Sequence, residues 1–418
     1  MNATLVFVLL FLLYMFDYID RQVITSLFPF LKGDLGVSDT QTGMLVSAVY
    51  WSIVVFALPA SILVDRWSRK KSISLMVALW SIATGAAVFV KTFPVLLLTR
   101  LGVGIGESGY SPGGTAMISA LYPVEKRSRM LGLWNASIPL GSALGVALGG
   151  MIATRWGWHR AFGLAAVPGL VVGMVFFLFA RDYRTVRLEV PPRAGAMARK
   201  MRAAEIVQEL FRKPSLLLTY VGFIGNAFLS TAYLAWLPSF FNRYTHVPMS
   251  SAGLMTASVL LFSIVGAPVG GVLVDAWRRR RTNARPLFAG VASLASAMAW
   301  LLAFGVLHGA GQYAAFMLGA ALSALYISAA SAVTQDVVHP GLWAVSWSIC
   351  VIVQNLLGSS LGPIAVGAIS DLRDLRTAML LVPFVSIAAG TLFLIASRFY
   401  ERDMSKVTPQ KIVMETAS

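Results

Sequence analysis

I-L-V-D-R-W at residues 62–67 recurs as V-L-V-D-A-W at 272–277, and a basic stretch follows each copy, S-R-K-K at 68–71 and R-R-R-R at 278–281. Each copy closes one apolar run and precedes another. Basic loops can look alike by chance, but a common L-V-D-x-W pattern in the same loop of both halves favours an internal duplication. We therefore expect two similar halves in parallel orientation.

The apolar runs around these loops are long enough to cross a bilayer, which takes about 20 residues per helix. Of the 418 residues, 57% are hydrophobic and 12% are charged, whereas soluble proteins carry about 25% charged residues. The core of a soluble domain has no room for so much apolar surface, so the composition argues against a soluble enzyme. The expected spans are 4–31, 42–64, 72–91, 94–121, 128–152, 159–180, 215–241, 251–274, 286–307, 310–335, 341–369 and 376–399.

These spans predict an all-α membrane protein with twelve transmembrane helices in two six-helix bundles. The longest polar stretch lies between the sixth and seventh spans, and residues 198–212 within it have the pattern of an amphipathic surface helix. The expected domains are an N-terminal bundle at 1–182, a cytoplasmic linker at 183–213, a C-terminal bundle at 214–400 and a cytoplasmic tail at 401–418.

The distribution of basic residues orients the chain. Twenty-five of the 34 Lys and Arg residues fall on the side of the linker, against seven on the opposite side. Loops rich in Lys and Arg stay in the cytoplasm, so we expect a multi-pass protein of the cell (inner) membrane with both termini inside. The net charge of +16 then reflects contact with anionic membrane lipids rather than nucleic acid. The first apolar run continues to about Phe30 without a small-residue cleavage site, which favours a retained helix over a signal peptide.

Metal and disulfide chemistry have no basis in the sequence. Cys350 is the only cysteine, which excludes an intramolecular disulfide and a cysteine metal cluster. The four histidines are scattered without ligand spacing, and Ser111 has no base partner that would make it a nucleophile. We expect no metal, no cofactor and no enzymatic activity, and a chain that acts as a monomer.

Five ionisable residues lie deep in the N-terminal spans: Asp17, Asp20 and Arg21 in the first span, and Arg100 and Glu107 in the fourth. Charge inside a bilayer is costly, so such residues mark candidate functional sites. Asp17 and Arg21 share one helical face, as do Arg100 and Glu107. Three acids and two bases leave one carboxylate without a partner, and burial favours the protonated form of such a group. We expect a proton carrier here. The alternative is a static ion-pair cluster that orients the helices.

The interior of the expected C-terminal spans holds no charge, since Asp336, Arg376 and Arg398 lie at or just beyond span ends, so we expect neutral, shape-based contact with a substrate in that half. Aromatic residues in membrane proteins are more often packing or interface residues than ligand contacts, and this alternative stays open for the aromatic candidates. The candidate substrate-binding residues, besides Arg21 and Arg100, are Tyr110, Asn226, Tyr233, Trp236, Gln354 and Asn355.

The loop D-R-W-S-R-K-K at 65–71 resembles the motif G-x-x-x-D-R-x-G-R-R/K of the major facilitator superfamily. Ser61 and Ser68 replace the usual glycines, and Ala276 replaces Arg in the second copy. The resemblance covers the whole twelve-helix plan. It implies that the acidic and basic residues of this loop latch neighbouring helices during a conformational change, with capping and positive-inside retention as the alternatives. The implied gating residues are Asp65, Arg66, Arg69, Asp275 and Arg278.

The N-terminal half is similar to spinster-type lipid transporters in two segments. D-Y-I-D-R at 17–21 resembles their Y-x-D-R signature, and R-L-G-V-G-I-G-E at 100–107 resembles their R-x-x-x-G-I-G-E segment. Organic anion:proton symporters of the same superfamily share the D-R pair and the R-x₆-E spacing. Both resemblances imply that Asp20 and Glu107 take protons, and that Arg21 and Arg100 pair with them or with an anionic substrate. Asp17 is a further proton-coupling candidate.

We therefore expect a secondary active transporter that couples protons to an organic anion or an amphipathic, lipid-like anion by alternating access. Its partners would be that small molecule, protons and membrane lipids. The alternatives are a drug or lipid efflux antiporter and a membrane sensor that does not transport. A sensor would need a soluble output domain or a long tail, and the duplicated latch loop suits alternating access better than a channel.

Overall fold

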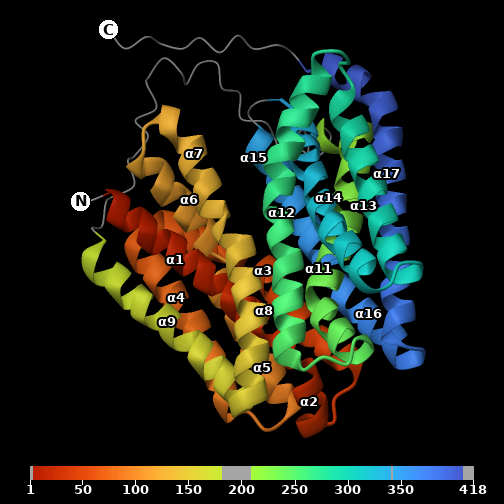
Figure 1. Cartoon of the computed structure of the whole chain (residues 1–418). Coiled ribbons are helices and arrows are strands. Elements are labelled where there is room, and N and C mark those ends of the chain that lie inside the picture. Colours follow the sequence, from red (N-terminus) through yellow and green to blue (C-terminus); the bar gives the residue numbers. More distant parts are fainter. Residues whose placement is uncertain (1–2, 181–208, 340–341, 408–418) are drawn as a thin grey trace.

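A computed structural model describes residues 3–180, 209–339 and 342–407 of the chain. These residues form helices and short connections, and no strand is present among them. Figure 1 shows two helical bundles side by side, one built from the first half of the sequence and one from the second. The expected all-α fold is confirmed. The expected linker at 183–213, including the amphipathic helix at 198–212, lies largely outside the described residues.

The N-terminal bundle ends at Phe179, and its helices are interrupted at several points. A 3₁₀ turn, η1, breaks the first span, and another, η2, ends the third. The elements are α1 (Ala3–Gln22), η1 (Val23–Leu27), α2 (Phe28–Leu35), α3 (Asp39–Arg66), α4 (Arg69–Ala86), η2 (Ala87–Phe89), α5 (Phe93–Glu107), α6 (Tyr110–Leu121), α7 (Val124–Asn135), α8 (Ser137–Trp156) and α9 (Trp158–Phe179).

The C-terminal bundle begins at Pro214 and has longer, less interrupted helices. Among its described residues, a π-helical segment, η5, lies between two shorter helices. The elements are α11 (Pro214–Tyr244), α12 (Met249–Arg278), α13 (Ala284–Gly305), α14 (Gly309–Asp336), α15 (Trp343–Val353), η5 (Gln354–Ser359), α16 (Leu361–Leu372) and α17 (Leu375–Ser405).

Local sequence explains where several helices begin. Ser38 and Gln41 form a capping box at the start of α3, in which each side chain accepts from the other residue's backbone N–H. The Asp374 side chain accepts from the Thr377 backbone N–H at the start of α17. Proline stands in the first turn of α5 and of α11, where its missing N–H costs nothing.

The fourth of the twelve expected spans is interrupted in the structure. Eleven helices in the described part of the chain are long and apolar enough to cross a membrane, whereas the expected span 94–121 divides into α5 and α6 at Ser108 and Gly109. Pro112 has no N–H to bond the Ser108 carbonyl, which breaks the helical ladder at this point. The break directly follows Glu107, so it shapes the neighbourhood of a candidate site residue.

The two bundles contact each other mainly at one end of the molecule. We call the side where α1 and α11 begin and α9 and α17 end the terminal face, and the opposite side the far end. Near the far end α8 packs against α12 and α3 packs against α16. A methyl group on Gly150 would collide with the Met249 carbonyl, and one on Gly43 would collide with the Pro363 carbonyl. Only glycine permits this close approach.

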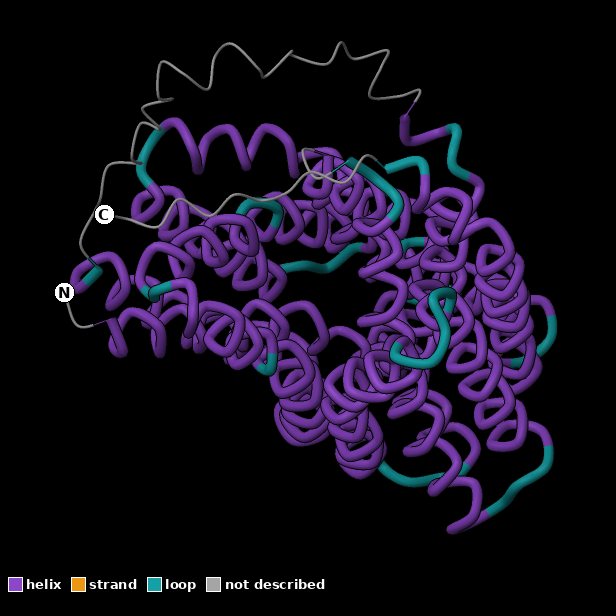
Figure 2. The backbone as a smooth tube through the Cα atoms, turned by 90° about the horizontal axis from the view of Figure 1, so that it is seen from above, coloured by secondary structure: helices purple, strands orange, loops and turns teal. Residues whose placement is uncertain are grey.

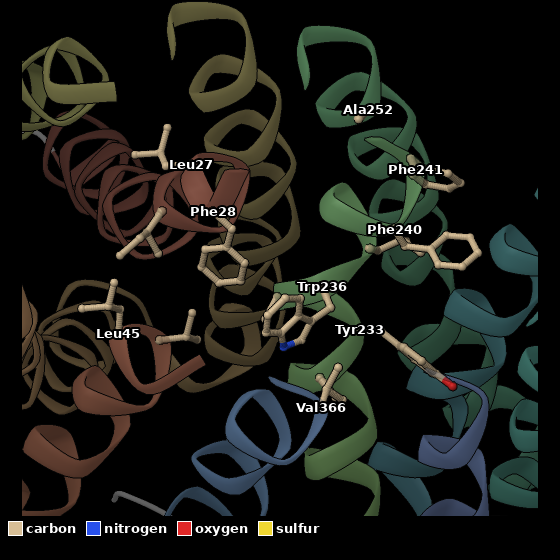
Figure 3. Packing of buried hydrophobic residues seen from close by; sticks show 14 of the residues in the cluster. Leu27, Phe28, Leu45, Tyr233, Trp236, Phe240, Phe241, Ala252 and Val366 are labelled. Carbon is tan, nitrogen blue, oxygen red and sulfur yellow. The ribbon is translucent and has the colours of Figure 1, made fainter. Parts of the chain in front are cut away.

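Figure 2, seen along the helices, shows the α1–α9 bundle on one side and the α11–α17 bundle on the other. The ribbons in Figure 1 converge at the far end and diverge toward the terminal face. A large hydrophobic cluster fills the convergent end and draws residues from both halves. Figure 3 shows Trp236 of α11 reaching toward Phe28 and Val366. The Trp236 and Phe28 ring centroids are 5.0 Å apart, and the Trp236 indole donates to the Pro363 carbonyl at 2.9 Å.

Candidate functional site

The five intramembrane charges of α1 and α5 meet in one cluster, which their side chains form across the space between the two helices. Arg21 Nη2 lies 2.6 Å from Glu107 Oε2 and 3.6 Å from Asp17 Oδ2. One guanidinium is therefore shared by two carboxylates, and all three side chains are buried. The shared face of Asp17 and Arg21 follows from their spacing of four residues on α1. In contrast, the pair of Arg21 with Glu107 joins two different helices.

Arg100 and Asp20 are buried beside this group but are bonded differently. Arg100 donates to the backbone carbonyls of Asp20 at 3.3 Å and of Arg21 at 3.4 Å. Both Asp20 carboxylate oxygens lack a hydrogen-bond partner. Arg100 and Glu107 are the charged groups that act most strongly on the Asp20 carboxylate. Asp20 is thus the carboxylate left without an ion pair, and Arg100 fixes the backbone at the Asp20–Arg21 step.

Two tyrosines flank the Arg21 guanidinium. Its carbon lies 4.7 Å from the Tyr18 ring centroid and 5.7 Å from that of Tyr50. Cation–π contacts of this kind contribute about 0.5–2 kcal/mol, depending on how far water is excluded. Protonation of Glu107 would remove one of the two anions that hold Arg21, and the tyrosine faces would keep the guanidinium in place. The arrangement can exchange a carboxylate for another anion without moving the arginine far.

A cavity of about 740 Å³ lies between the two halves. Most of its lining is apolar, and its polar groups are mainly hydroxyls. The N-terminal half contributes Tyr18 and residues of α7 and α8, with Asn135, Ile138 and Ser142 among them, and the C-terminal half contributes residues of α11, α12, α13 and α14. A cavity of this size accommodates a drug-sized or larger molecule.

Tyr18 is the residue that belongs to both the ion cluster and the cavity. It lines the cavity and its ring contacts the Arg21 guanidinium, whereas none of the five charged residues is part of the lining. The charges therefore stand behind the cavity wall, with one aromatic ring between them and the space where a ligand would lie.

The structure divides the candidate substrate-binding residues. Tyr233 lines the cavity, stacks on Trp300 with centroids 4.0 Å apart, and donates to the Met379 carbonyl. Trp236 lies in the inter-half cluster instead. Tyr110 is buried and its hydroxyl donates to the Leu10 carbonyl at 2.6 Å, so it packs α6 against α1. Only Tyr233 of these three faces the cavity.

Three neutral candidates of the C-terminal half also lie away from the cavity lining. Asn226 donates to Ser293 Oγ at 3.0 Å and accepts from Ser386 Oγ at 2.9 Å, which makes it the centre of a buried polar node. Gln354 and Asn355 stand half-buried in the π-helical segment η5. Such segments are frequent at functional sites, but these two side chains do not line the cavity described above.

The expected gating residues lie at the terminal face, where the halves diverge. Asp275 and Arg278 are exposed at the end of α12, and Arg69 opens α4 in the other half. The side chains of Asp65 and Arg66 lie outside the described part of the structure. Ser68, which replaces a glycine of the motif, accepts from the Lys71 backbone N–H and caps α4.

Sequence reasoning missed an ion network at the far end that connects the two halves. Asp39, the first residue of α3, is bonded by Arg243 of α11 through two contacts of 2.7 Å. Lys32 donates to the same carboxylate at 2.7 Å and Ser370 at 2.6 Å. Asp371 in turn accepts from the backbone N–H groups of Asp39 and Thr40. A charge at a span boundary gives no sign in the sequence of partners so distant along the chain.

Metal binding has no support among the described residues, where no group of three or more His, Cys, Asp or Glu side chains is placed to hold an ion. Cys350 is buried and free.

Comparison with known proteins supports the resemblances found in the sequence. The model of the Major Facilitator Superfamily matches residues 10–356. Protein spinster homolog 1 of Xenopus tropicalis is 27% identical, covering 97% of this chain and 82% of that protein. The sphingosine-1-phosphate transporter SPNS2 of Danio rerio is 26% identical over 94% of this chain and 84% of that protein. The hexuronate transporter of Bacillus subtilis (strain 168) is 25% identical over 80% of each chain.

Among solved structures, a bacterial homolog of the human lysosomal transporter spinster, in an inward-facing and unoccupied conformation, aligns with a TM-score of 0.84. It is 22% identical, and the match covers 96% of this chain and 98% of that one. At this identity the likeness concerns the fold. The peptide transporter POT aligns with a TM-score of 0.75 at 14% identity. The predicted superfamily fold is confirmed.

Proposed function

The chain belongs to the major facilitator superfamily, and on that premise we propose that it is a proton-coupled secondary active transporter for an amphipathic organic anion. It is a multi-pass membrane protein whose relatives are transporters, not enzymes. The observation that carries the finer proposal is the sharing of the Arg21 guanidinium between Glu107 at 2.6 Å and Asp17 at 3.6 Å. Two carboxylates compete for one cation, so a proton on one of them changes what that cation can hold.

The coupling follows from charge balance in a buried site. When Glu107 takes a proton, Arg21 keeps only the longer contact to Asp17 and has a free charge for an anion. When the anion leaves, Arg21 draws Glu107 back into the pair and the proton is released. An unpaired charge in a buried site is costly, so Arg21 exchanges one anionic partner for another rather than remaining unpaired.

The cavity lining favours an amphipathic ligand over a small hydrophilic one. Leu229, Leu234, Leu260, Ile264 and Ile327 offer apolar surface, and Ser230, Ser263 and Ser328 offer scattered hydroxyls. An apolar portion of the ligand would lie against the C-terminal half, and its anionic end would lie toward Tyr18 and Arg21. This arrangement fits a phosphorylated lipid better than a hexuronate.

Alternating access requires that the far end opens while the terminal face closes. In the present conformation the far end is held by the Asp39–Arg243 network and the glycine contacts between halves. The distribution of basic residues supports a cytoplasmic terminal face, and hence an inward-facing state in a cell (inner) membrane. We propose that the transporting unit is a monomer, since one chain contains both halves and the cavity between them.

Uptake into proteoliposomes tests the proposal. Purified protein is reconstituted at a fixed orientation, and labelled sphingosine-1-phosphate or glucuronate is offered with and without an imposed pH gradient. We expect gradient-stimulated movement of the amphipathic probe, and its loss in Glu107→Gln. The matched control is Asp374→Asn, an acid outside the cluster. Equal flux with and without the gradient in the wild type would contradict proton coupling.

An efflux antiporter is the second candidate, and the apolar cavity lining favours it because drugs and lipids share this chemistry. The same vesicles distinguish the two. Symport moves the probe and the proton in one direction, so an acidic compartment loses probe to the neutral one. Antiport accumulates the probe on the acidic side.

A further inference from the structure

Three buried polar groups on α4 have no hydrogen-bond partner in the described structure: Trp80 Nε1, Ser81 Oγ and Thr84 Oγ1. Their side chains are at most 1% exposed. Buried polar groups in folded proteins are nearly always bonded, and ordered water supplies the bond where the protein does not. Three such groups within two turns of one helix therefore indicate a small polar site.

The site adjoins Asp20. The Thr84 hydroxyl lies near enough to act on the Asp20 carboxylate, and neither group has a partner within hydrogen-bond geometry. A methyl group placed on Gly169 of α9 would lie 2.8 Å from Ser81 Oγ and 3.8 Å from Trp80 Nε1. The two polar atoms thus meet at the seam between α4 and α9. We call Trp80, Ser81 and Thr84 the α4 polar row.

The polar row continues toward the terminal face. Ser74, two turns before Ser81 on the same side of α4, also has a buried hydroxyl without a partner. It lines a groove of about 200 Å³ between α4 and α9. Val77 lies between Ser74 and Ser81 and lines the same groove. Ala78 lies there too and also lines the groove, so two apolar side chains of α4 stand between the groove and the polar row.

The other half shows that the fold itself does not require such unpaired groups. The corresponding spans there are α11, α13 and α17, and they meet in the node formed by Asn226, Ser293 and Ser386. Every contact of that node is an ordinary hydrogen bond, with Asn226 bonded at 3.0 Å and 2.9 Å. The N-terminal half has a carboxylate and unpaired hydroxyls in place of this closed, neutral set.

We propose that the α4 polar row holds water beside Asp20 and that protons reach Asp20 from the terminal face along the α4–α9 seam, apart from the substrate cavity. The role of the proton in transport rests on the proposed function. The charged groups that face Asp20 are Arg100 and Glu107 of α5, and α4 contributes the hydroxyls. Thr84 and Ser81 are positioning residues here, because they act through water on the carboxylate. Separate routes would let the cavity hold an apolar ligand while Asp20 stays in contact with solvent protons.

Hydroxyl-radical footprinting of the full chain in lipid nanodiscs detects water next to buried side chains. Trp134 and Trp236 are matched controls, since both are as buried as Trp80 but donate their indole N–H to backbone carbonyls. We expect Trp80 to be oxidised several-fold faster than either control in the wild type. Labelling of Trp80 at or below the rate of Trp134 would overturn the proposal without any variant, and would leave the transport test unaffected.

The double variant Ser81→Ala/Thr84→Val removes both hydroxyls with little change in volume. Thr99→Val is the control, because Thr99 bonds the Leu96 carbonyl in its own helix. We expect several-fold slower Trp80 oxidation in the double variant, and a several-fold lower ratio of pH-driven uptake to counterflow of the same lipid probe. A folded double variant that keeps the wild-type rate of Trp80 oxidation and the wild-type ratio of pH-driven uptake to counterflow would overturn the route. A wild type that ignores the pH gradient would instead contradict the proposed function, while Trp80 labelling still decides whether the row is hydrated.

Discussion

Asp39 of α3 and Arg243 of α11 form a two-point ion pair across the halves, with both nitrogen–oxygen contacts at 2.7 Å. Lys32 and Ser370 bond the same carboxylate, and Asp371 caps the start of α3 from the other half. The carboxylate is buried while Arg243 remains partly exposed. This network holds the far end closed and must break for the cavity to open there.

Asp39→Asn is therefore expected to favour states with an open far end. The neutral amide keeps the size of the side chain but loses the ion pairs, at a cost of about 1–3 kcal/mol to the closed state. The measurement is the distance between spin labels at residues 91 and 308, two exposed far-end positions in different halves, in a Cys350→Ser background. We expect a new, longer distance population. Asp374→Asn is the matched control. If the distance distribution of Asp39→Asn were identical to that of the control, the Asp39 network would not be what holds the far end closed.

The geometry of Arg21 predicts unequal roles for its two carboxylates. Glu107 makes the short contact at 2.6 Å and Asp17 the long one at 3.6 Å. We expect Glu107→Gln to abolish pH-driven uptake. Asp17→Asn should lower it by about one order of magnitude or less, because loss of the longer contact removes no more than about 1.4 kcal/mol, which corresponds to a factor of ten in rate. Initial rates in proteoliposomes at matched protein density give the comparison. Equal losses, or a larger loss in Asp17→Asn, would show that the short contact is not the one that couples.

Sequence reasoning identified the charged residues of the site but not their pairing. The spacing of Asp17 and Arg21 predicts a shared helical face, and the structure places them 3.6 Å apart. The Arg100 and Glu107 spacing also predicts one face, yet Glu107 pairs across helices with Arg21 while Arg100 bonds backbone carbonyls. Which helices meet is decided by tertiary packing, and no helical period contains that information.

For the same reason, the sequence did not predict the cavity or the ion network around Asp39 at the far end. The cavity is lined by ordinary leucines, isoleucines and serines whose positions resemble those of lipid-facing residues. Asp39 is bonded by residues 204 and 331 positions further along the chain. The break of the fourth span was signalled by Pro112, but proline is common in membrane helices, so the sequence alone did not separate a break from a tolerated kink.

A pH effect on stability is expected at Asp374, which lies in the loop before α17. Its pKa is lowered by hydrogen bonds from the Thr377 side chain and backbone and from Tyr244. A lowered pKa means that the contribution is present above the unfolded value of about 3.9 and is lost as the pH falls through the folded value. Asp374→Ala should lose the helix cap, worth about 1 kcal/mol.

Thermal unfolding followed by tryptophan fluorescence measures this effect. We expect the melting temperature of Asp374→Ala to lie below that of the wild type at pH 7, and the difference to shrink as the pH falls below about 4. Asp374→Asn should retain most of the wild-type stability at pH 7, because Asn is also a good cap. A difference that stays constant down to the lowest pH would show that the lost interaction does not depend on the charge.

The size and polarity of the cavity predict which ligands a bulky substitution excludes. Ser263 of α12 lines the cavity, whereas Leu261, two residues earlier, is 40% exposed on the outer surface of the helix. Ser263→Trp places an indole in the space of about 740 Å³, and Leu261→Trp adds the same group toward lipid. Substrate pockets bury most of a ligand's surface, so a large amphipathic probe should be excluded before a small one. We expect Ser263→Trp to suppress sphingosine-1-phosphate uptake strongly and glucuronate uptake weakly, with Leu261→Trp close to wild type for both. Suppression of both probes to the same extent would mean that the apolar part of the cavity is not where the larger ligand lies.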